Sequence, residues 1–199
     1  VAIGLEADDD EVLRFHWNKG FSTKQWHRAV DILRENGLGV KTYLLFKPPF
    51  MSEGDALNHC VEWIRTVAPI SDEVSVNPMN IQRRTIVDRL FRNREYRPPW
   101  LWSLVEMIER VHPAEGRLIV HPTAAGKIRG AHNCGKCDRE VGAAIERYSV
   151  SMDIAEFTGL DCECKKRWRC EVELDAAIPA PLGVGLDRRG DHIDALMSP

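Results

Sequence analysis

The sequence predicts an α/β protein that forms part of a (β/α) barrel and carries a small cysteine-rich metal-binding element toward its carboxyl end. Short apolar segments rich in β-branched residues alternate with amphipathic segments, which is the order of parallel βα units. The strand-like segments recur at roughly 35–40 residues, a spacing that suits a barrel or part of one. Beyond residue 130 the pattern changes, and two close pairs of cysteines have the spacing of a metal site.

Local signals predict each element in turn. Ser22 and Gln25 form a capping box that begins a helix, and Gly37 ends it. Helices are expected to begin at Ser22, Ser52, Thr85 and Pro98, and to lie near 141–148 and 153–160. Strands are expected at 1–5, 40–46, 73–76 and 118–120, with a further strand-like segment at 171–174.

We expect three parts along the chain. Residues 1–125 form the barrel portion, 126–175 a cysteine-rich zinc-binding extension, and 176–199, which is rich in Pro and Gly and then charged, an extended or mobile tail. The chain begins on Val1, directly in a strand-like segment, so we expect that an N-terminal portion is missing from it.

The net charge of −3 hides a strong asymmetry. Residues 6–11 are mostly acidic, whereas 83–97 are rich in arginine. A basic block on an acidic protein is either a phosphate-binding face or a solvated helix surface. The sequence shows neither a signal peptide nor an apolar run near the roughly 20 residues of a membrane span, so we expect a cytoplasmic protein with reduced thiols.

The two cysteine pairs predict a site with four thiolate ligands. Cys134 and Cys137 are separated by a turn that contains Gly135, and Cys162 and Cys164 complete a tetrahedral set. Zinc is the expected ion; redox thiols or an iron–sulfur cluster are the alternatives. His132 is a spare candidate ligand. Cys170 is expected to be structural, with the alternative that it replaces Cys164. Cys60 lies on the apolar face of a helix and is expected in the core.

The predicted strands change abruptly from apolar to polar where they end. Glu6, Lys47 and the run 77–82 occupy these positions. Reactive groups in parallel βα folds lie at the carboxyl ends of strands, so this edge is the expected ligand pocket. The alternative is that polar residues stand here because the chain meets water.

Several strings resemble a known family of enzymes. Gly4-Leu5-Glu6, residues 18–22 and residues 33–37 resemble the radical SAM family that includes the Elongator catalytic subunit. Four narrower strings, at 47–50, 77–82, 97–103 and 129–138, resemble radical SAM proteins of archaeosine biosynthesis. The resemblance covers about residues 1–170.

The resemblance implies a partial TIM barrel that holds a [4Fe–4S] cluster and S-adenosylmethionine, whose reductive cleavage gives a 5′-deoxyadenosyl radical. The implied substrate is a lysine-adducted 7-deazaguanine in tRNA. Cleavage of the lysine C–N bond leaves the formamidine of archaeosine, and a transferase partner resembling tRNA-guanine transglycosylase attaches the lysine first. The residues expected to contact S-adenosylmethionine are Glu6, Lys19, Lys47, Asn77 and Gln82; for Glu6 the alternative is a salt bridge with Lys19 or Lys47.

A basic set is expected to contact tRNA phosphates. Its members are Arg83, Arg84, Arg92, Arg94, Arg97, Lys165 and Lys166. Trp100 and Trp102 lie nearby, and we expect both in the core, although one of them could stack on a flipped base.

One feature departs from the family pattern. The Cys-x-x-x-Cys-x-x-Cys motif that holds the radical-generating cluster is absent from these 199 residues. There are therefore two alternatives to the archaeosine hypothesis. The chain could be a non-catalytic, zinc-containing RNA-binding or scaffolding piece whose partner carries the cluster, or an Elongator-like radical SAM protein.

Overall fold

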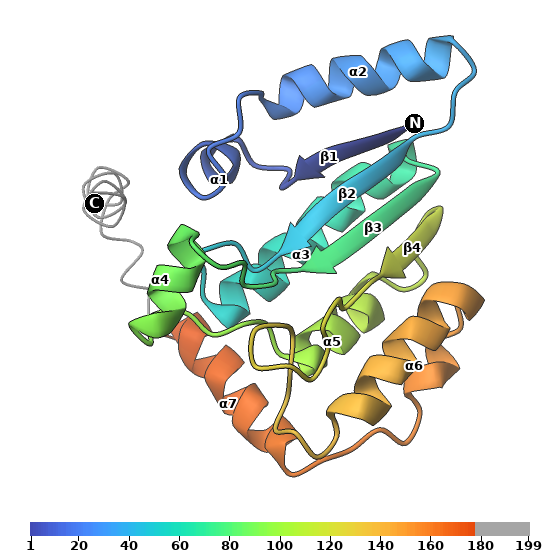
Figure 1. Ribbon diagram of the computed structural model, residues 1–199. Helices are drawn as coiled ribbons and strands as arrows, with labels where there is room; N and C mark the ends of the chain where they lie inside the picture. The colour runs from blue at the N-terminus through green and yellow to red at the C-terminus, as the bar shows by residue number, and fades with distance from the viewer. Residues whose placement is uncertain (178–199) are drawn as a thin grey trace.

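A computed structural model describes residues 1–177 of the chain, and it contains a parallel four-stranded sheet (Figure 1). The strands follow one another in the order β1 (Ala2–Glu6), β2 (Lys41–Phe46), β3 (Glu73–Pro78) and β4 (Arg117–Val120). Each neighbouring pair is parallel. The four strands expected from the sequence are therefore confirmed, with shifts of one or two residues at their ends.

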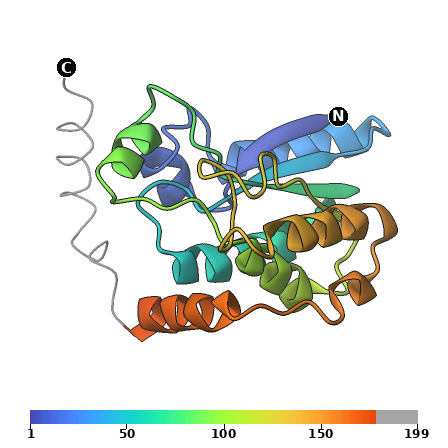
Figure 2. The same ribbon diagram turned by 60° about the horizontal axis from the view of Figure 1, so that its bottom comes forward.

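The connections between strands are helical. The α-helices are α1 (Asp10–Phe15), α2 (Thr23–Glu35), α3 (Glu53–Val67), α4 (Ile86–Arg92), α5 (Leu101–Val111), α6 (Asp138–Ser151) and α7 (Cys164–Ala177). Two short 3-10 helices cover Ala68–Ile70 and Ile154–Phe157. Helices α3, α5 and α6 lie on one side of the sheet, and α7 lies outside α3 and α5 (Figure 2). In the described residues, no helix combines the length and apolar character needed to cross a membrane.

Burial along β2 alternates between fully buried and half-buried residues. Leu44 pairs in register with Val76, which pairs with Val120, and all three are fully buried. The other face carries polar residues at the start of the strands, where Lys41 Nζ lies 2.6 Å from a carboxylate oxygen of Glu73. Parallel sheets are normally covered on both faces. One face of this sheet is thus fully covered by helices and the other only partly, as in a segment of a barrel.

Local capping places several helices as the sequence predicts. The Ser22–Gln25 capping box is present at the start of α2, and the Ser52 side chain accepts a hydrogen bond from the Asp55 amide at the start of α3. The Thr85 side chain caps α4 in the same way, accepting from the Asp88 amide. Because these bonds satisfy amides that a helix leaves free at its start, they fix where the chain turns after each strand.

Two predictions of secondary structure are wrong, and one helix was not predicted. That helix is α1, which begins in the acidic run and which Asp9 caps by accepting from the amides of Glu11 and Val12. Residues 171–174 belong to α7, because Trp168 and Val172 are one helical turn apart and pack together on the core. The helix expected near 153–160 is only the 3-10 turn Ile154–Phe157, followed by Gly159 with φ of 79°.

The cysteine-rich part shares its core with the barrel part. Ala131, Val141 and Ile145 belong to the same cluster of buried apolar residues as Leu44 and Val76. Trp100 and Trp102 are both buried, as expected. Of the expected tail, 176–177 form the end of α7, and 178–199 lie outside the described residues.

A buried carboxylate joins four segments of the molecule. Glu53, the first residue of α3, accepts hydrogen bonds from Lys47 Nζ at 2.7 Å, the Trp100 amide at 2.8 Å and Ser103 Oγ at 2.5 Å. Ser103 Oγ in turn accepts from Trp168 Nε1 of α7 at 2.8 Å. A buried charge is tolerated only when it is paired and hydrogen-bonded. Glu53 therefore ties the end of β2 to α5 and, through Ser103, to α7.

Replacing Glu53 with Gln should destabilise the protein strongly. The change leaves the Lys47 ammonium, whose side chain is 6% exposed, without its counter-charge. We expect the free energy of unfolding to fall by about 3–5 kcal/mol, the usual result of removing one partner of a buried pair. Urea unfolding measures it, with the exposed Glu115→Gln as the control that should change stability by less than about 0.5 kcal/mol. Equal stability of Glu53→Gln and wild type would contradict this role.

Candidate metal centre and strand-end face

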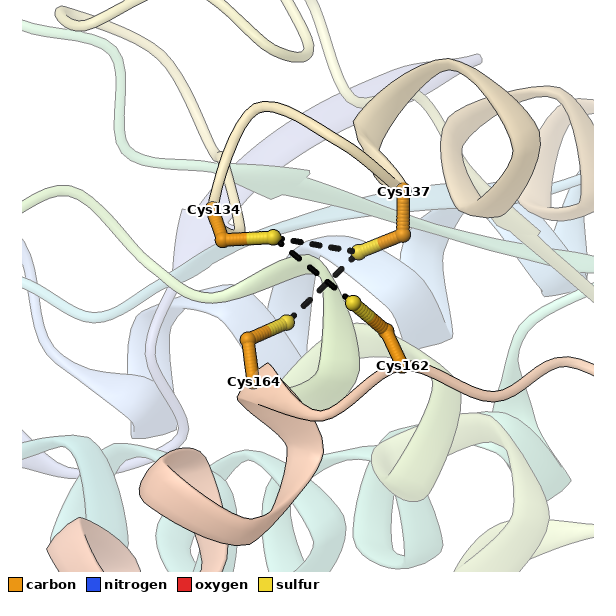
Figure 3. Close-up of side chains that lie close together, drawn as sticks. All are labelled: Cys134, Cys137, Cys162 and Cys164. Carbon is orange, nitrogen blue, oxygen red and sulfur yellow. Dashed lines mark hydrogen bonds between the residues drawn. The ribbon is translucent and has the colours of Figure 1, made fainter.

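Four cysteine sulfurs converge on one point beside α6 and α7 (Figure 3). The Sγ atoms of Cys134, Cys137, Cys162 and Cys164 all lie within 4.8 Å of one another. The separations are 4.0 Å for Cys134–Cys137, 3.7 Å for Cys134–Cys162 and 3.6 Å for Cys137–Cys164. No pair is joined as a disulfide. The predicted ligands are thus brought together, and their arrangement is one that can bind a single metal ion.

The first pair lies on a tight turn that leads into α6. Gly135 adopts a φ of 90°, a conformation that L side chains rarely take. The carboxylate of Asp138 accepts hydrogen bonds from the Asn133 amide at 2.9 Å and the Gly135 amide at 2.6 Å. This carboxylate therefore folds the turn and aims both sulfurs at the same point.

The second pair lies at the start of α7. Cys164 is the first residue of the helix, and the Lys165 amide donates to the Cys162 carbonyl at 2.8 Å. Trp168, one turn further on, is 4% exposed and packs in the common core. The position of the second pair is therefore fixed by the docking of α7.

Side chains of the barrel part and the loop donate hydrogen bonds to two of the sulfurs. Trp102 Nε1 lies 3.3 Å from Cys164 Sγ, and Asn133 Nδ2 lies 3.3 Å from Cys137 Sγ. The Asn133 Oδ1 atom accepts from the Trp102 amide at 3.3 Å. Donors around metal-bound thiolates orient them and offset their charge. Asn133 and Trp102 could not be predicted from the sequence as partners of the site, because their contacts depend on how α5 packs.

The thiols differ in acidity. Hydrogen bonds from the backbone amide of Lys136 and, to a lesser extent, of Cys137 lower the pKa of Cys134 to about 7. Burial raises the pKa of Cys137 to about 11 and also raises the pKa of Cys164. A bound cation favours the deprotonated form of every ligand. Cys134 is thus the sulfur that the protein itself prepares for metal binding.

The other candidate ligands lie outside this set. Cys60 is fully buried and donates to Met107 Sδ at 3.4 Å, as expected for a core residue. Cys170 is exposed on α7, and Cys164 rather than Cys170 completes the group. His132 Nδ1 lies 2.8 Å from the Gly130 carbonyl oxygen. The described residues therefore offer four sulfur ligands at one place.

Glu6 and Lys19 form an ion pair at the end of β1. Lys19 Nζ lies 2.9 Å from Glu6 Oε1, and both side chains are partly exposed, at 30% and 16%. Glu6 has a φ of 71°, and Lys47 at the end of the neighbouring strand has a φ of 59°. Left-handed backbone is uncommon for such residues and tends to mark functional sites.

The remaining strand-end candidates differ in accessibility. Lys47 is buried on Glu53, and its carbonyl accepts from the Tyr96 hydroxyl at 2.8 Å. Asn77, near the end of β3, is half-buried, and Gln82 is exposed. Glu6, Lys47 and Asn77 thus lie along one edge of the sheet. The ammonium group of Lys47 already pairs with Glu53 and is not available to a ligand.

The basic candidates fall into two groups. Arg83, Arg84, Arg92 and Arg94 are exposed on and around α4, whereas Lys165 and Lys166 lie at the start of α7, far from α4 (Figure 1). Lys165 Nζ stands 4.8 Å from the centre of the Trp102 ring. Arg97 is partly buried, stacks on Trp100, and donates to the carbonyls of Pro98 and His132 at 2.7 Å each. Arg97 therefore fastens the cysteine-rich loop to the barrel part.

Asp88 holds the basic segment in place. Its carboxylate accepts from Arg129 at 2.7 Å, from Arg92 at 3.0 Å and from the Arg84 amide at 3.0 Å. The Arg129 hydrogen bond, followed by that of the Arg84 amide, lowers the pKa of Asp88 to about 2. One carboxylate thus joins α4 to the loop that precedes the first cysteine pair.

Comparison with known proteins places these features in context. The chain is 37% identical over 178 residues to archaeosine synthase subunit beta of Methanosarcina acetivorans, a match that covers 88% of this chain and 51% of that protein. It is 41% identical over 177 residues to archaeosine synthase subunit beta of Thermococcus kodakarensis, with 87% and 54% covered. An uncharacterized protein of Methanocaldococcus jannaschii is 28% identical over 189 residues. The chain spans about half the length of these curated relatives. No family model matches.

The fold is also similar to that of solved structures, among them an archaeal Elp3. The archaeal Elp3 of Methanocaldococcus infernus, with an N-terminal deletion, aligns with a TM-score of 0.57 at 19% identity over 81% of this chain and 37% of that one. The fold and the cysteine group together show a partial (β/α) barrel with four cysteines that could hold one metal ion. Over the span that it covers, the chain is similar to archaeosine synthase subunit beta of two archaea.

Replacing Cys134 with Ser should release the metal. The hydroxyl is a much poorer ligand than a thiolate, and three sulfurs remain. We expect about one ion per chain in the wild type and a value near zero in Cys134→Ser, measured by inductively coupled plasma mass spectrometry. The matched control is Cys170→Ser, an exposed cysteine outside the group, which should keep the full content. Equal metal content in wild type and Cys134→Ser would remove the metal assignment.

Proposed function

We propose that this chain is the latter portion of a radical SAM barrel that modifies tRNA in archaeosine formation. The observation that carries the proposal is the identity of 37–41% to two archaeosine synthase beta subunits over nearly nine-tenths of the chain. The parallel sheet with polar strand ends supports it, because ligands of such folds bind at that edge. The substrate is tRNA carrying a lysine-adducted 7-deazaguanine, and the reaction is cleavage of the lysine C–N bond.

The described residues do not fit the radical-generating cluster. Apart from the converging set, the chain has Cys60 in the core and Cys170 on the surface, and neither can complete a three-cysteine motif. The [4Fe–4S] cluster of the proposed enzyme is therefore held by residues outside this chain, on the same or on a second polypeptide. This chain contributes the edge that receives the other ligands.

The strand-end residues have distinct proposed roles toward S-adenosylmethionine. Glu6, with a carboxylate oxygen not used by Lys19, accepts from the ammonium or the ribose hydroxyls of the ligand. Lys19 binds the carboxylate of the methionyl part of the ligand. Asn77 and Gln82 hydrogen-bond adenine or the substrate. Lys47 acts indirectly, because its ammonium group is held by Glu53 and shapes the adjoining turn.

Zinc is the ion that we propose for the four cysteines. A tetrahedral site with zinc–sulfur bonds of about 2.3 Å places its sulfurs about 3.8 Å apart. Three of the six sulfur–sulfur separations, 3.6, 3.7 and 4.0 Å, agree with that value, and all six stay within 4.8 Å. In a [4Fe–4S] cluster each thiolate binds a different iron, and in a [2Fe–2S] cluster the thiolates are divided between two irons, so some of the sulfurs would lie further apart. The site is structural, because all four ligand positions are taken by protein.

The partners follow from the same relatives. The name subunit beta implies a second subunit in those proteins. We propose that this chain works with a lysine transferase similar to tRNA-guanine transglycosylase, which supplies the adduct. The exposed arginines around α4, together with Lys165 and Lys166, bind tRNA phosphates, and Arg97 supports them structurally.

A second candidate function is a non-catalytic RNA-binding or scaffolding piece. The absence of the cluster motif from the sequence favours it. The Elongator-like alternative has less support, because the match to Elp3 is a likeness of fold at 19% identity.

The activity test uses protein that contains this chain, purified without oxygen and combined with S-adenosylmethionine, a reductant, its proposed partner and isotopically labelled, lysine-adducted tRNA. We expect 5′-deoxyadenosine to form together with archaeosine, detected by mass spectrometry of the digested tRNA. Unmodified tRNA is the control and should give no archaeosine. Binding of tRNA with no 5′-deoxyadenosine would support the scaffolding candidate instead.

A further inference from the structure

A pocket of about 470 Å³ lies between the barrel part and the cysteine-rich part, beside the end of β2. Met51 and Ser52 line it from the turn before α3, and residues 94–98 line it from the segment that follows α4. The cysteine-rich part contributes Glu171 on α7, with Ile128 and His132 on the preceding loop. Its volume is within the range of small-ligand sites, about 300–1,000 Å³. The four thiols do not line this space, and of the residues expected to contact S-adenosylmethionine only Lys47, whose ammonium is held by Glu53, lies in its wall.

The walls of the pocket combine apolar surface with hydrogen-bond acceptors. Phe91 is half-buried and Ile128 is 70% exposed, so both present apolar surface to a ligand. Glu171 accepts from Trp100 Nε1 at 3.1 Å through one oxygen, which leaves the other oxygen for a ligand. Glu95 contributes a second exposed carboxylate. A flat ring with N–H groups along one edge fits such walls.

Arg94 places a cation at the rim of the pocket. It follows the end of α4 with a φ of 64°, a position where glycine is usual because a side chain is strained there. The turn is held by the Arg94 amide, which donates to Phe91 O at 3.1 Å, and by the Glu95 amide, which donates to Leu90 O at 2.8 Å. Arg94 is exposed, and within residues 1–177 its guanidinium forms no ion pair, so at this rim it is well placed to bind a phosphate.

We propose that this pocket binds one unstacked nucleotide of an RNA strand, an inference that rests on the proposed function because RNA is taken as the substrate. The base lies against Phe91 and Ile128 and donates its N–H groups to Glu171 and Glu95, while Arg94 binds the adjoining phosphate. The strand continues over the other exposed arginines of α4. Because the acceptors are carboxylates, the pocket favours bases with amino groups (adenine, cytosine and guanine) over uracil.

The carboxylates also decide against a simpler ligand. A free phosphate or a small carboxylic acid would meet Glu95 and Glu171 inside the same space and be repelled. Arg97 has fewer N–H groups left to donate to a small anion, since its guanidinium already donates to the carbonyls of Pro98 and His132. A nucleotide satisfies both sets of groups, because its base donates and its phosphate accepts.

The test is fluorescence anisotropy with oligo(A), oligo(C) and oligo(U) of one length, and with tRNA, at several salt concentrations. We expect oligo(A) and oligo(C) to bind roughly tenfold more tightly than oligo(U). Ile128→Asp should weaken oligo(A) binding roughly tenfold, whereas Ile32→Asp, an exposed apolar residue on α2, should leave it unchanged. Glu171→Gln should reduce the preference for oligo(A) over oligo(U).

A separate variant distinguishes the pocket from general attraction to phosphates. Arg83→Gln combined with Arg84→Gln should weaken all three oligonucleotides alike and flatten the salt dependence, leaving the base preference intact. Each variant is checked for metal content and thermal unfolding. If RNA binds but Ile128→Asp and Glu171→Gln behave as wild type, the pocket is wrong and the proposed function stands. If neither tRNA nor the oligonucleotides bind, both are wrong.

Discussion

The convergence of four thiols on one point is the constraint on which the cysteine-rich part of the molecule depends. Their sulfurs lie within 4.8 Å of one another, and once ionised they would repel each other. At about 4 Å, two like charges repel by roughly 4 kcal/mol near a protein surface. A bound cation attracts all four thiolates and outweighs their mutual repulsion, so the geometry is stable as a metal site. The convergence joins the start of α6, which follows the first cysteine pair, to the start of α7, which contains the second.

From this centre, direct contacts lead to the edge of the sheet. Trp102 donates to a sulfur from α5, and four residues beyond Cys164 the indole of Trp168 donates to Ser103. Ser103 donates to Glu53, which pairs with Lys47 at the end of β2. The metal-binding element is therefore joined to the barrel part by buried polar contacts as well as by a common apolar core. A change at the metal has a physical route to the strand ends.

The sequence could predict the features that depend on residues close together along the chain. The capping box at Ser22 and the alternation along 40–46 are local patterns, and the cysteine pairs have a spacing that needs no knowledge of the fold. Glu53 could not be predicted in the same way, because two of its three partners, Trp100 and Ser103, lie at the start of α5 and meet it only when α3 and α5 pack. The strand expected at 171–174 failed for the same reason, since Trp168 decides which face of that segment is buried. Lys47 was correctly placed at a strand end, yet its charge is satisfied by a residue six positions later.

The edges of the sheet bear on how this chain relates to its longer relatives. In the described residues the sheet ends at β1 on one side and at β4 on the other, and the curated relatives are about twice as long as this chain. A four-stranded parallel sheet with two open edges has the form of a barrel segment. The cysteine-rich part places α7 across the outer helices and, through His132 and Glu171, forms one wall of the pocket beside β2.

X-ray absorption on the purified protein tests the central claim, that one ion held by four thiolates stabilises the cysteine-rich part of the molecule. We predict an absorption edge of zinc and a single shell of four sulfurs at about 2.3 Å. A shell of nitrogen or oxygen ligands, or scattering from one iron by another, would contradict it.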